Sequence, residues 1–168
     1  MIDLTSQSPF GQALPLTIGG IVISEKPHKN LWSVAPFAGQ QDACVAALRA
    51  VGIAWPDIGR ATADAFWFGM DQVMITRATL PDLPAAVTDQ RDAWARVTVK
   101  GQVRDVLARL VPVDLNAKSG TVLRTQVGHM PAHIRIRGAH HIEIMVMRSM
   151  AQTLVHDLTK AAQAVAAR

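Results

Sequence analysis

Apolar and polar side chains alternate along much of this chain, and a period of two residues predicts short β-strands. The alternation extends over residues 16–25, 30–37, 93–101 and 121–130, and over two short runs on either side of Gly69. In the third of these segments, the side chains of Ala95, Val97 and Val99 would share one face of the strand. Sheets with one apolar face are therefore expected in both halves of the chain.

Apolar positions repeat every three to four residues in three other segments, which predicts helices at residues 40–52, 102–111 and 149–166. The last helix would bury a stripe formed by Met150, Ala151, Leu154, Leu158, Ala161, Ala162 and Val165. Residues 80–90 are rich in proline and are expected to link the two halves, with one or two helical turns of their own.

The order of these elements indicates the fold class. Strands come in pairs between helices, which is typical of an α+β fold with mixed or antiparallel sheets and not of a doubly wound parallel sheet. We expect an irregular arm over residues 1–15, a first α+β lobe over residues 16–88 and a second over residues 89–168, all in one compact unit. Each lobe would be a small sheet with helices packed on one face. A chain of 168 residues can bury a core without disulfides.

A β-hairpin is predicted within residues 128–144, GHMPAHIRIRGAHHIEI, which hold four of the six histidines. A loop centred on Ala139 pairs Ile136 with Ile142 and keeps the isoleucines of both strands on one face. A two-residue turn would mix the two faces, so the apolar pattern selects the first register. Its polar face then pairs Arg135 with Glu143, Arg137 with His141, and His133 with Met145.

The hairpin histidines do not have the spacing of a metal site. His133 and His141 would share a face but lie about 13 Å apart along the sheet, whereas zinc needs ligand nitrogens about 2 Å from one ion. His140 is expected in the loop, and His129 at the end of the preceding strand. We therefore predict no metal site, and histidines that face solvent or a partner. A coupled protonation near neutral pH remains an alternative.

Other patterns of catalytic residues are missing from the sequence. Cys44, the single cysteine, lies on the apolar stripe of its helix and is expected to be buried and inert. The sequence has no G-x-S-x-G, no G-x-G-x-x-G and no G-x-x-x-x-G-K-[ST] motif. Its two glutamates, Glu25 and Glu143, have no carboxylate neighbours in sequence that would make an acid–base pair. We predict no catalytic, cofactor-binding or metal residues.

Positive charge is concentrated in the second half. Residues 1–83 have a net charge of −2, and residues 84–168 have +6. A basic half favours an acidic partner or nucleic acid. All eight aromatic residues lie at or before Trp94, however, so the basic half offers no ring on which a base could stack. A protein partner is therefore expected rather than nucleic acid.

The same sequence argues against a membrane or an export signal. No run of about 18 uncharged apolar residues occurs. The first residues, MIDLTSQSPF, lack the basic and apolar regions of a secretory signal. With a single cysteine, these features favour a cytoplasmic protein.

Three stretches of the second half form a recognisable series: VTVKGQVRDVLARLVPVDL, VLRTQVGHMPAHIRI and IEIMVMRSMAQTLVHDL. Their common features are Gly101 between a strand and a helix, Asp114-Leu115, Arg124-Thr125, Gly128-His129-Met130-Pro131 before a strand, and Arg148-Ser149 through Leu154 at the last helix. This series resembles the gamma subunit of heterotetrameric sarcosine oxidase. The resemblance covers most of residues 16–166 and is most specific from residue 95 to 158.

The resemblance implies a fold and a role. The fold would be two ferredoxin-like lobes, similar to the tetrahydrofolate-binding region of the glycine-cleavage T-protein. The complex demethylates sarcosine oxidatively to glycine. This chain would be a non-catalytic subunit that binds no cofactor, and its partners would be the alpha, beta and delta subunits. FAD, FMN, NAD, zinc and tetrahydrofolate would be bound by the complex as a whole.

The resemblance also implies an interface and leaves alternatives. We expect an acidic surface of a larger subunit to meet the polar hairpin face, formed by Arg124, His133, Arg135, Arg137, His141 and Glu143. One alternative is the small subunit of a related N-methyl amino acid dehydrogenase that acts on N-methylglutamate. Another is a stand-alone folate-binding or aminomethyltransferase-like protein.

Overall fold

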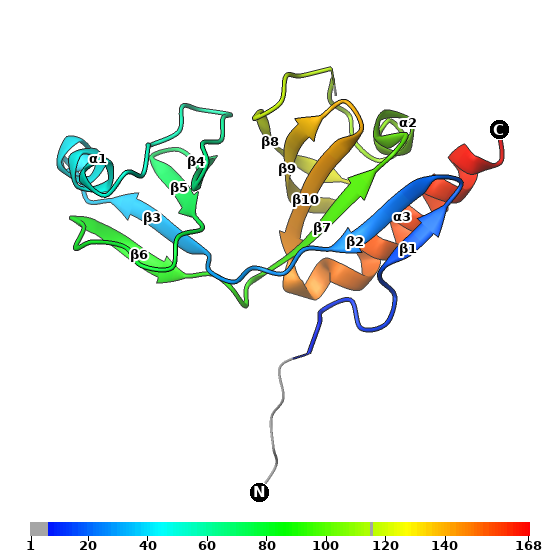
Figure 1. The fold of residues 1–168 in the computed structure, drawn as a ribbon, viewed down its shortest axis with the longest axis horizontal. Helices are drawn as coiled ribbons and strands as arrows, with labels where there is room; N and C mark the ends of the chain where they lie inside the picture. Colours follow the sequence, from blue (N-terminus) through cyan, green and yellow to red (C-terminus); the bar gives the residue numbers. More distant parts are fainter. Residues whose placement is uncertain (1–6, 115) are drawn as a thin grey trace, which may run out of the picture.

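Two antiparallel sheets form the frame of the molecule (Figure 1). The computed structural model describes residues 7–114 and 116–168, so residues 1–6 of the expected arm and Leu115 of the Asp114-Leu115 motif lie outside the described residues. The larger sheet has the order β1-β2-β7-β10-β9-β8. Its strands are β1 Leu16–Ile18, β2 Ile21–Glu25, β7 Trp94–Lys100, β10 His141–Met147, β9 Met130–Gly138 and β8 Val122–Val127.

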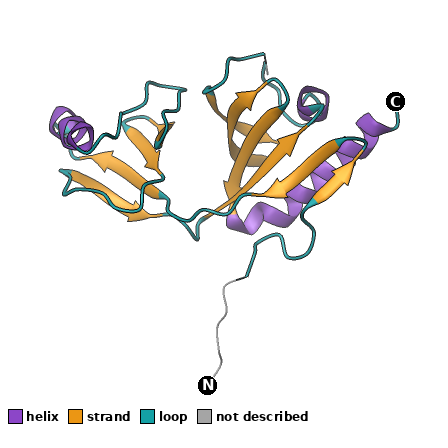
Figure 2. Ribbon diagram, viewed as in Figure 1, coloured by secondary structure: helices purple, strands orange, loops and turns teal. Residues whose placement is uncertain are grey.

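The smaller sheet has four strands in the order β4-β5-β3-β6. They are β4 Ala65–Gly69, β5 Gln72–Ile75, β3 Trp32–Pro36 and β6 Ala85–Asp89. Helix α1, Gln41–Ala50, lies on the side of this sheet that faces away from the larger sheet (Figure 2). Its buried residues Cys44 and Leu48 pack on Val34 and Ile75, so the expected burial of the cysteine is confirmed.

One face of the larger sheet is covered by helices. Helix α2, Val103–Leu107, and helix α3, Ala151–Ala166, pack there, and a short 3₁₀ turn, Arg148–Met150, leads into α3. The predicted apolar stripe of the last helix is confirmed, since Leu154, Leu158 and Ala162 are fully buried in this core. Each buried leucine or isoleucine of such a core contributes about 1.5–3 kcal/mol relative to an exposed one.

The expected boundary between the halves does not coincide with the division into sheets. Residues 16–25 form not one strand but the β1–β2 hairpin, which turns at Gly19-Gly20 and joins the larger sheet by pairing β2 with β7. Ile21 and Ile23 thereby enter the core of the second half. The physical reason is that β7 has an open edge that this hairpin can satisfy, and such a distant pairing leaves no mark in the local pattern.

Two other expected elements differ in the structure. Within residues 80–90, the segment Ala85–Asp89 is strand β6 and not helical, because it pairs with β3. The helix expected over residues 102–111 is regular only over Val103–Leu107. Turns follow this short helix, as the hydrogen bond from the Leu110 N–H to the Leu107 carbonyl shows.

The expected hairpin register is confirmed over most of its length. Ile142 pairs with Ile136, Ile144 with Ile134, and Glu143 with Arg135. The exception is His141, which pairs with Gly138 and not with Arg137, because the register shifts between His141 and Ile142. An irregularity of this kind adds a residue to one strand and cannot be read from the apolar pattern.

A third cluster joins the two sheets on the side away from α2 and α3. The smaller sheet contributes Phe66 and Met74, together with Leu31 just before β3. These side chains pack against Val122 and Met145 of the larger sheet. The larger sheet is thus covered by helices on one face and, over part of the other face, by the smaller sheet. No helix in the described part of the chain is long and apolar enough to cross a membrane.

Gly101 generates a prediction about stability. Its φ is +104°, and a Cβ there would lie 2.6 Å from the Gly20 carbonyl oxygen, so neither the backbone conformation nor the space suits another residue. We expect Gly101→Ala to lower the free energy of unfolding by about 3 kcal/mol, measured by urea denaturation.

The matched control is Gly52→Ala. Gly52 has a φ of +78° but nothing within 4 Å of an added Cβ, so only the backbone strain applies and the loss should be about 1 kcal/mol. Equal losses for the two variants would show that the β1–β2 turn does not approach Gly101 as closely as described.

Candidate functional site

The polar face of the larger sheet carries the candidate site. Strand register places on this face the side chains of Lys26, Arg96, Lys100, Arg124, Arg135, Arg137, His133, His141 and Glu143. Among the described residues of this face, six are lysine or arginine and one is a carboxylate. The face is therefore strongly positive, and it includes the whole polar hairpin face expected from the sequence.

Glu143 lies at the centre of this charge. Its side chain is 3% exposed and accepts a short hydrogen bond from the Lys26 ammonium. The Arg137 Nε lies 3.3 Å from its Oε1, and the Arg96 Nη1 lies 3.8 Å from its Oε2. Burial alone would raise the pKa of this carboxyl, but the bond to Lys26 and the charges of Arg137 and Arg96 outweigh burial and lower it.

Arg135 lies across from Glu143 but makes no ion pair among the described residues. One of its terminal nitrogens, Nη2, donates to the Thr62 carbonyl at 3.0 Å, which links the larger sheet to the segment before β4. Its Nε is buried and has no hydrogen-bond partner among the described residues. Burial and the charge of Arg137 lower the pKa of this guanidinium. Arg135 thus holds a half-buried positive charge that would gain from a neighbouring anion.

His133 takes part in packing within the chain. It is 7% exposed, its ring stacks on Phe68 with centroids 4.3 Å apart, and the edge of Trp94 lies against it. Its Nε2 donates to the Phe68 carbonyl at 3.0 Å. Burial lowers its pKa, so the ring is neutral near pH 7. The expectation of a solvent- or partner-facing His133 is wrong, because the smaller sheet covers this position.

The remaining residues of the face are more accessible. Arg124 and Arg137 are exposed, and His141 is half-buried. His140 lies in the hairpin loop as expected, where its Nδ1 donates to the Gly101 carbonyl at 3.2 Å. In the described part of the chain, no three His, Cys, Asp or Glu side chains are grouped so that they could hold a metal ion.

Three cations of this face were missed by sequence reasoning. Arg96 and Lys100 alternate with the apolar residues of β7, so their shared face was readable. That these two cations lie beside the hairpin could not be predicted, because their position depends on the pairing of β7 with β10. Lys26 follows β2 and reaches Glu143 only because β2 adds to the other side of β7.

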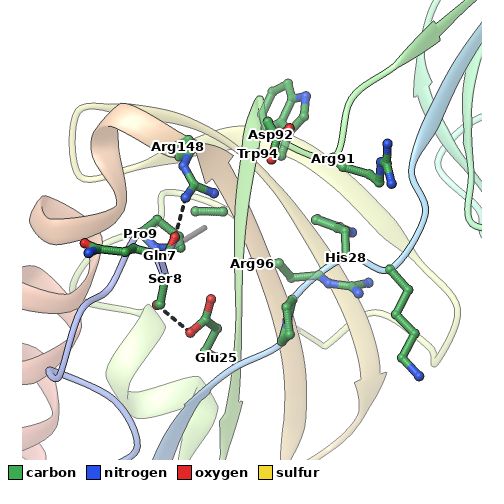
Figure 3. A pocket seen from close by; sticks show the side chains of 13 residues that line it. Gln7, Ser8, Pro9, Glu25, His28, Arg91, Asp92, Trp94, Arg96 and Arg148 are labelled. Carbon is green, nitrogen blue, oxygen red and sulfur yellow. Dashed lines mark hydrogen bonds between the residues drawn. The ribbon is translucent and has the colours of Figure 1, made fainter. Parts of the chain in front are cut away.

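A pocket of about 500 Å³ lies beside this face, at the start of β7, where the chain passes between the two sheets (Figure 3). Its lining combines positive and negative side chains, namely Lys29, Arg91, Arg96 and Arg148 with Glu25 and Asp92. Arg148 donates to the Gln7 carbonyl, and the Ser8 hydroxyl donates to Glu25 at 2.6 Å (Figure 3). Ser8 therefore pairs with a carboxylate and not with a histidine base.

His28 lines the same pocket and is isolated. Neither of its ring nitrogens has a hydrogen-bond partner among the described residues. Burial, followed by the charge of Arg96, lowers its pKa to about 4. The ring is neutral at physiological pH, which avoids a further positive charge beside Lys26 and Arg96.

Glu143 generates a prediction about stability. Glu143→Gln removes the one carboxylate that the positive face shares, and a buried ion pair that loses one partner is strongly destabilised. Because Lys26 and Arg137 can partly reach water, we expect a loss of about 2–3 kcal/mol at pH 7 by urea denaturation. The folded-state pKa is lowered, so the loss should shrink as the pH falls below about 4.

A surface ion pair provides the control for this prediction. Asp89 and Arg91 form a contact of 2.6 Å on the surface, and Asp89→Asn makes the same change of acid to amide. We expect little effect from it, because exposed pairs contribute little. A Glu143→Gln variant as stable as Asp89→Asn would contradict the central role of Glu143.

His28 generates a prediction about pH. Its pKa is about 4 in the folded chain and about 6.5 in the unfolded chain, so the unfolded state binds the proton more tightly between these values. This histidine therefore supports folding above pH 6.5, and its contribution is lost as the pH falls to 4. As the pH falls from 6.5 to 4, we expect the free energy of unfolding of the parent chain to drop by about 2 kcal/mol more than that of His28→Gln. Parallel pH curves of the two proteins would show that His28 can take up a proton where it lies.

Comparison with known proteins agrees with the resemblance at the level of the fold. No family model and no curated protein matches the chain. Among solved structures, a chain of the heterotetrameric sarcosine oxidase from Corynebacterium sp. U-96, in complex with pyrrole 2-carboxylate, matches with a TM-score of 0.80 and 18% identity over 97% of both chains. The regulatory subunit of aspartate kinase from Thermus thermophilus matches at a TM-score of 0.37 with 10% identity over 83% of this chain and 96% of that chain, a similarity too low to indicate a shared fold. The chain thus has the fold of a chain of heterotetrameric sarcosine oxidase, over almost its whole length.

Proposed function

We propose that this chain is the gamma-type subunit of a cytoplasmic heterotetrameric sarcosine oxidase. The observation that carries the proposal is the fold match over 97% of both chains, at a TM-score of 0.80. A match of nearly the whole of one chain to the whole of another favours an equivalent subunit over a shared domain. In the proposed role, the chain supports oxidative demethylation of sarcosine to glycine and contributes no catalytic residue.

The proposal assigns the cofactors to the other subunits. FAD, FMN, NAD, zinc and tetrahydrofolate would be bound by the alpha, beta and delta subunits, and none by this chain. The chain's own contribution would be a surface for assembly.

The positive face supports the proposed partner surface. Its six cations share one carboxylate, Glu143, and that carboxylate is already in contact with three of them. Acidic side chains of a larger subunit would supply the missing negative charge and steer association. Because His133 and Glu143 are buried within the chain, the contact would be made by the accessible residues Lys100, Arg124, Arg137 and His141.

Co-expression tests the proposed function. The full chain is expressed with the alpha, beta and delta subunits encoded in the same genome, and the mixture is purified through a tag on the alpha subunit. We expect one complex that contains this chain and oxidises sarcosine with release of hydrogen peroxide. N-methylglutamate, assayed in parallel, identifies the related dehydrogenase instead. A complex that assembles and turns over fully without this chain would refute the proposal.

Charge reversal tests the surface. We expect Lys100→Glu combined with Arg124→Glu to weaken retention in the complex at least about tenfold at low salt, and less at high salt, because surface charges are screened. The matched control is Arg109→Glu, an exposed arginine next to α2 at the opposite face of the sheet. Retention equal to that of the control would place the interface elsewhere, provided both variants melt like the parent chain.

A further inference from the structure

The edges of the two sheets differ in how they are protected. The edge strands β8 and β4 each donate a backbone hydrogen bond to the segment between the sheets. The Val122 N–H of β8 donates to the Gly59 carbonyl at 2.7 Å, and the Trp67 N–H of β4 donates to the Arg60 carbonyl at 2.9 Å. The edge strand β1 has only three residues. Strand β6 has five residues and is the outermost strand of the smaller sheet (Figure 1).

Alternate backbone groups of β6 point away from the sheet. The Gln90 N–H donates to the Leu31 carbonyl, and the Phe37 N–H donates to the Pro84 carbonyl. These two bonds fix the alternation, so even-numbered residues of β6 pair with β3 and odd-numbered residues face outward. Both backbone groups of Val87 and of Asp89 are therefore directed to the free edge.

The side chains of β6 protect this edge only at its ends. Residues 86–89 are all exposed, and the strand itself contains no lysine, proline or bulge. Pro84 precedes the strand, and the one charged residue of β6, Asp89, lies at its last position and is paired with Arg91. Val87 is 41% exposed, and Phe37, next to the start of the strand, is 57% exposed. An edge with free backbone groups and an exposed apolar centre at Val87 is a template for another strand.

A groove of about 520 Å³ lies against the same edge. Its lining includes Trp32, Leu80, Leu83 and Val87, with Asp82 as its one charged residue. Val87 pairs with Val34, whose side chain packs on α1, so the groove opens on the α1 side of the sheet. A strand paired with β6 would place every second side chain on this side.

We propose that β6 binds an extended segment of another polypeptide as an added strand, with an apolar side chain of that segment in the groove beside Val87. Backbone hydrogen bonds at Val87 and Asp89 would supply affinity, and the groove would supply selectivity. Asp82 favours a neutral or basic segment. The identity of the partner as another subunit of the oxidase rests on the proposed function.

A second copy of this chain fits the edge less well. Antiparallel pairing about Val87 would direct Val87, Ala85 and Asp89 of the copy toward the groove side. These side chains are too small to fill about 520 Å³, and the aspartate would approach Asp82. The chemistry of the groove therefore favours a different polypeptide with a larger apolar side chain.

Hydrogen exchange of the complex, read by mass spectrometry, tests this inference. In the purified assembly, the amides of residues 85–89 should exchange at least about tenfold more slowly than in the isolated full chain. Val87→Pro, which removes one outward N–H that the sheet does not use, should abolish this protection and leave the melting temperature of the isolated chain nearly unchanged. Val87→Ile is the control that should behave as the parent chain.

The outcomes separate the two proposals. A complex that contains this chain but leaves residues 85–89 unprotected overturns the added strand and leaves the proposed function standing. If no complex forms, the proposed function fails, and the full chain is titrated with the peptide Lys-Val-Thr-Leu-Thr-Val-Lys. Shifts of the Val87 and Asp89 amide resonances then support the edge site, and their absence overturns it. A dimer of the isolated chain that Val87→Pro dissociates would overturn the choice of a different polypeptide.

Discussion

The pairing of β7 with β2 on one side and β10 on the other is the constraint on which the rest of the structure depends. It joins an N-terminal hairpin to a C-terminal one and places Val99 between Ile23 of β2 and Ile142 of β10. Because strands alternate their side chains, the same pairing that completes the apolar core also gathers the polar residues of these strands on the opposite face. The core and the positive face are two consequences of one register.

The positive face is stabilised by one buried carboxylate that forms ion pairs with three cations. Glu143 would be costly to bury alone, and Lys26, Arg96 and Arg137 would repel one another without it. The arrangement leaves Arg135 without a direct ion pair and His28 neutral. Both side chains have buried nitrogens with no hydrogen-bond partner among the described residues. A surface with surplus positive charge and incomplete hydrogen bonding is suited to a partner that brings carboxylates.

The smaller sheet contacts the larger sheet on one side and ends in an edge strand on the other. It covers part of the positive face through Phe68, which stacks on His133, and through the Thr62 carbonyl, which accepts a bond from Arg135. Its far edge, β6, pairs with no further strand in the described part of the chain. The molecule thus has one surface suited to charge recognition and one suited to backbone pairing, and a subunit of a larger assembly can use both.

The sequence by itself determined the features that depend on neighbouring residues. The α+β class, the stripe of the last helix and the pairing of Ile136 with Ile142 follow from local periodicity, because a slip of one residue would expose an apolar face. Its motifs also indicated the fold that the comparison with solved structures supports. Only the tertiary structure decided that β1 and β2 belong to the larger sheet, that residues 85–89 form an edge strand, and that His133 is buried. Each of these depends on contacts between segments distant in the chain, and the energy of such contacts does not appear in any local pattern.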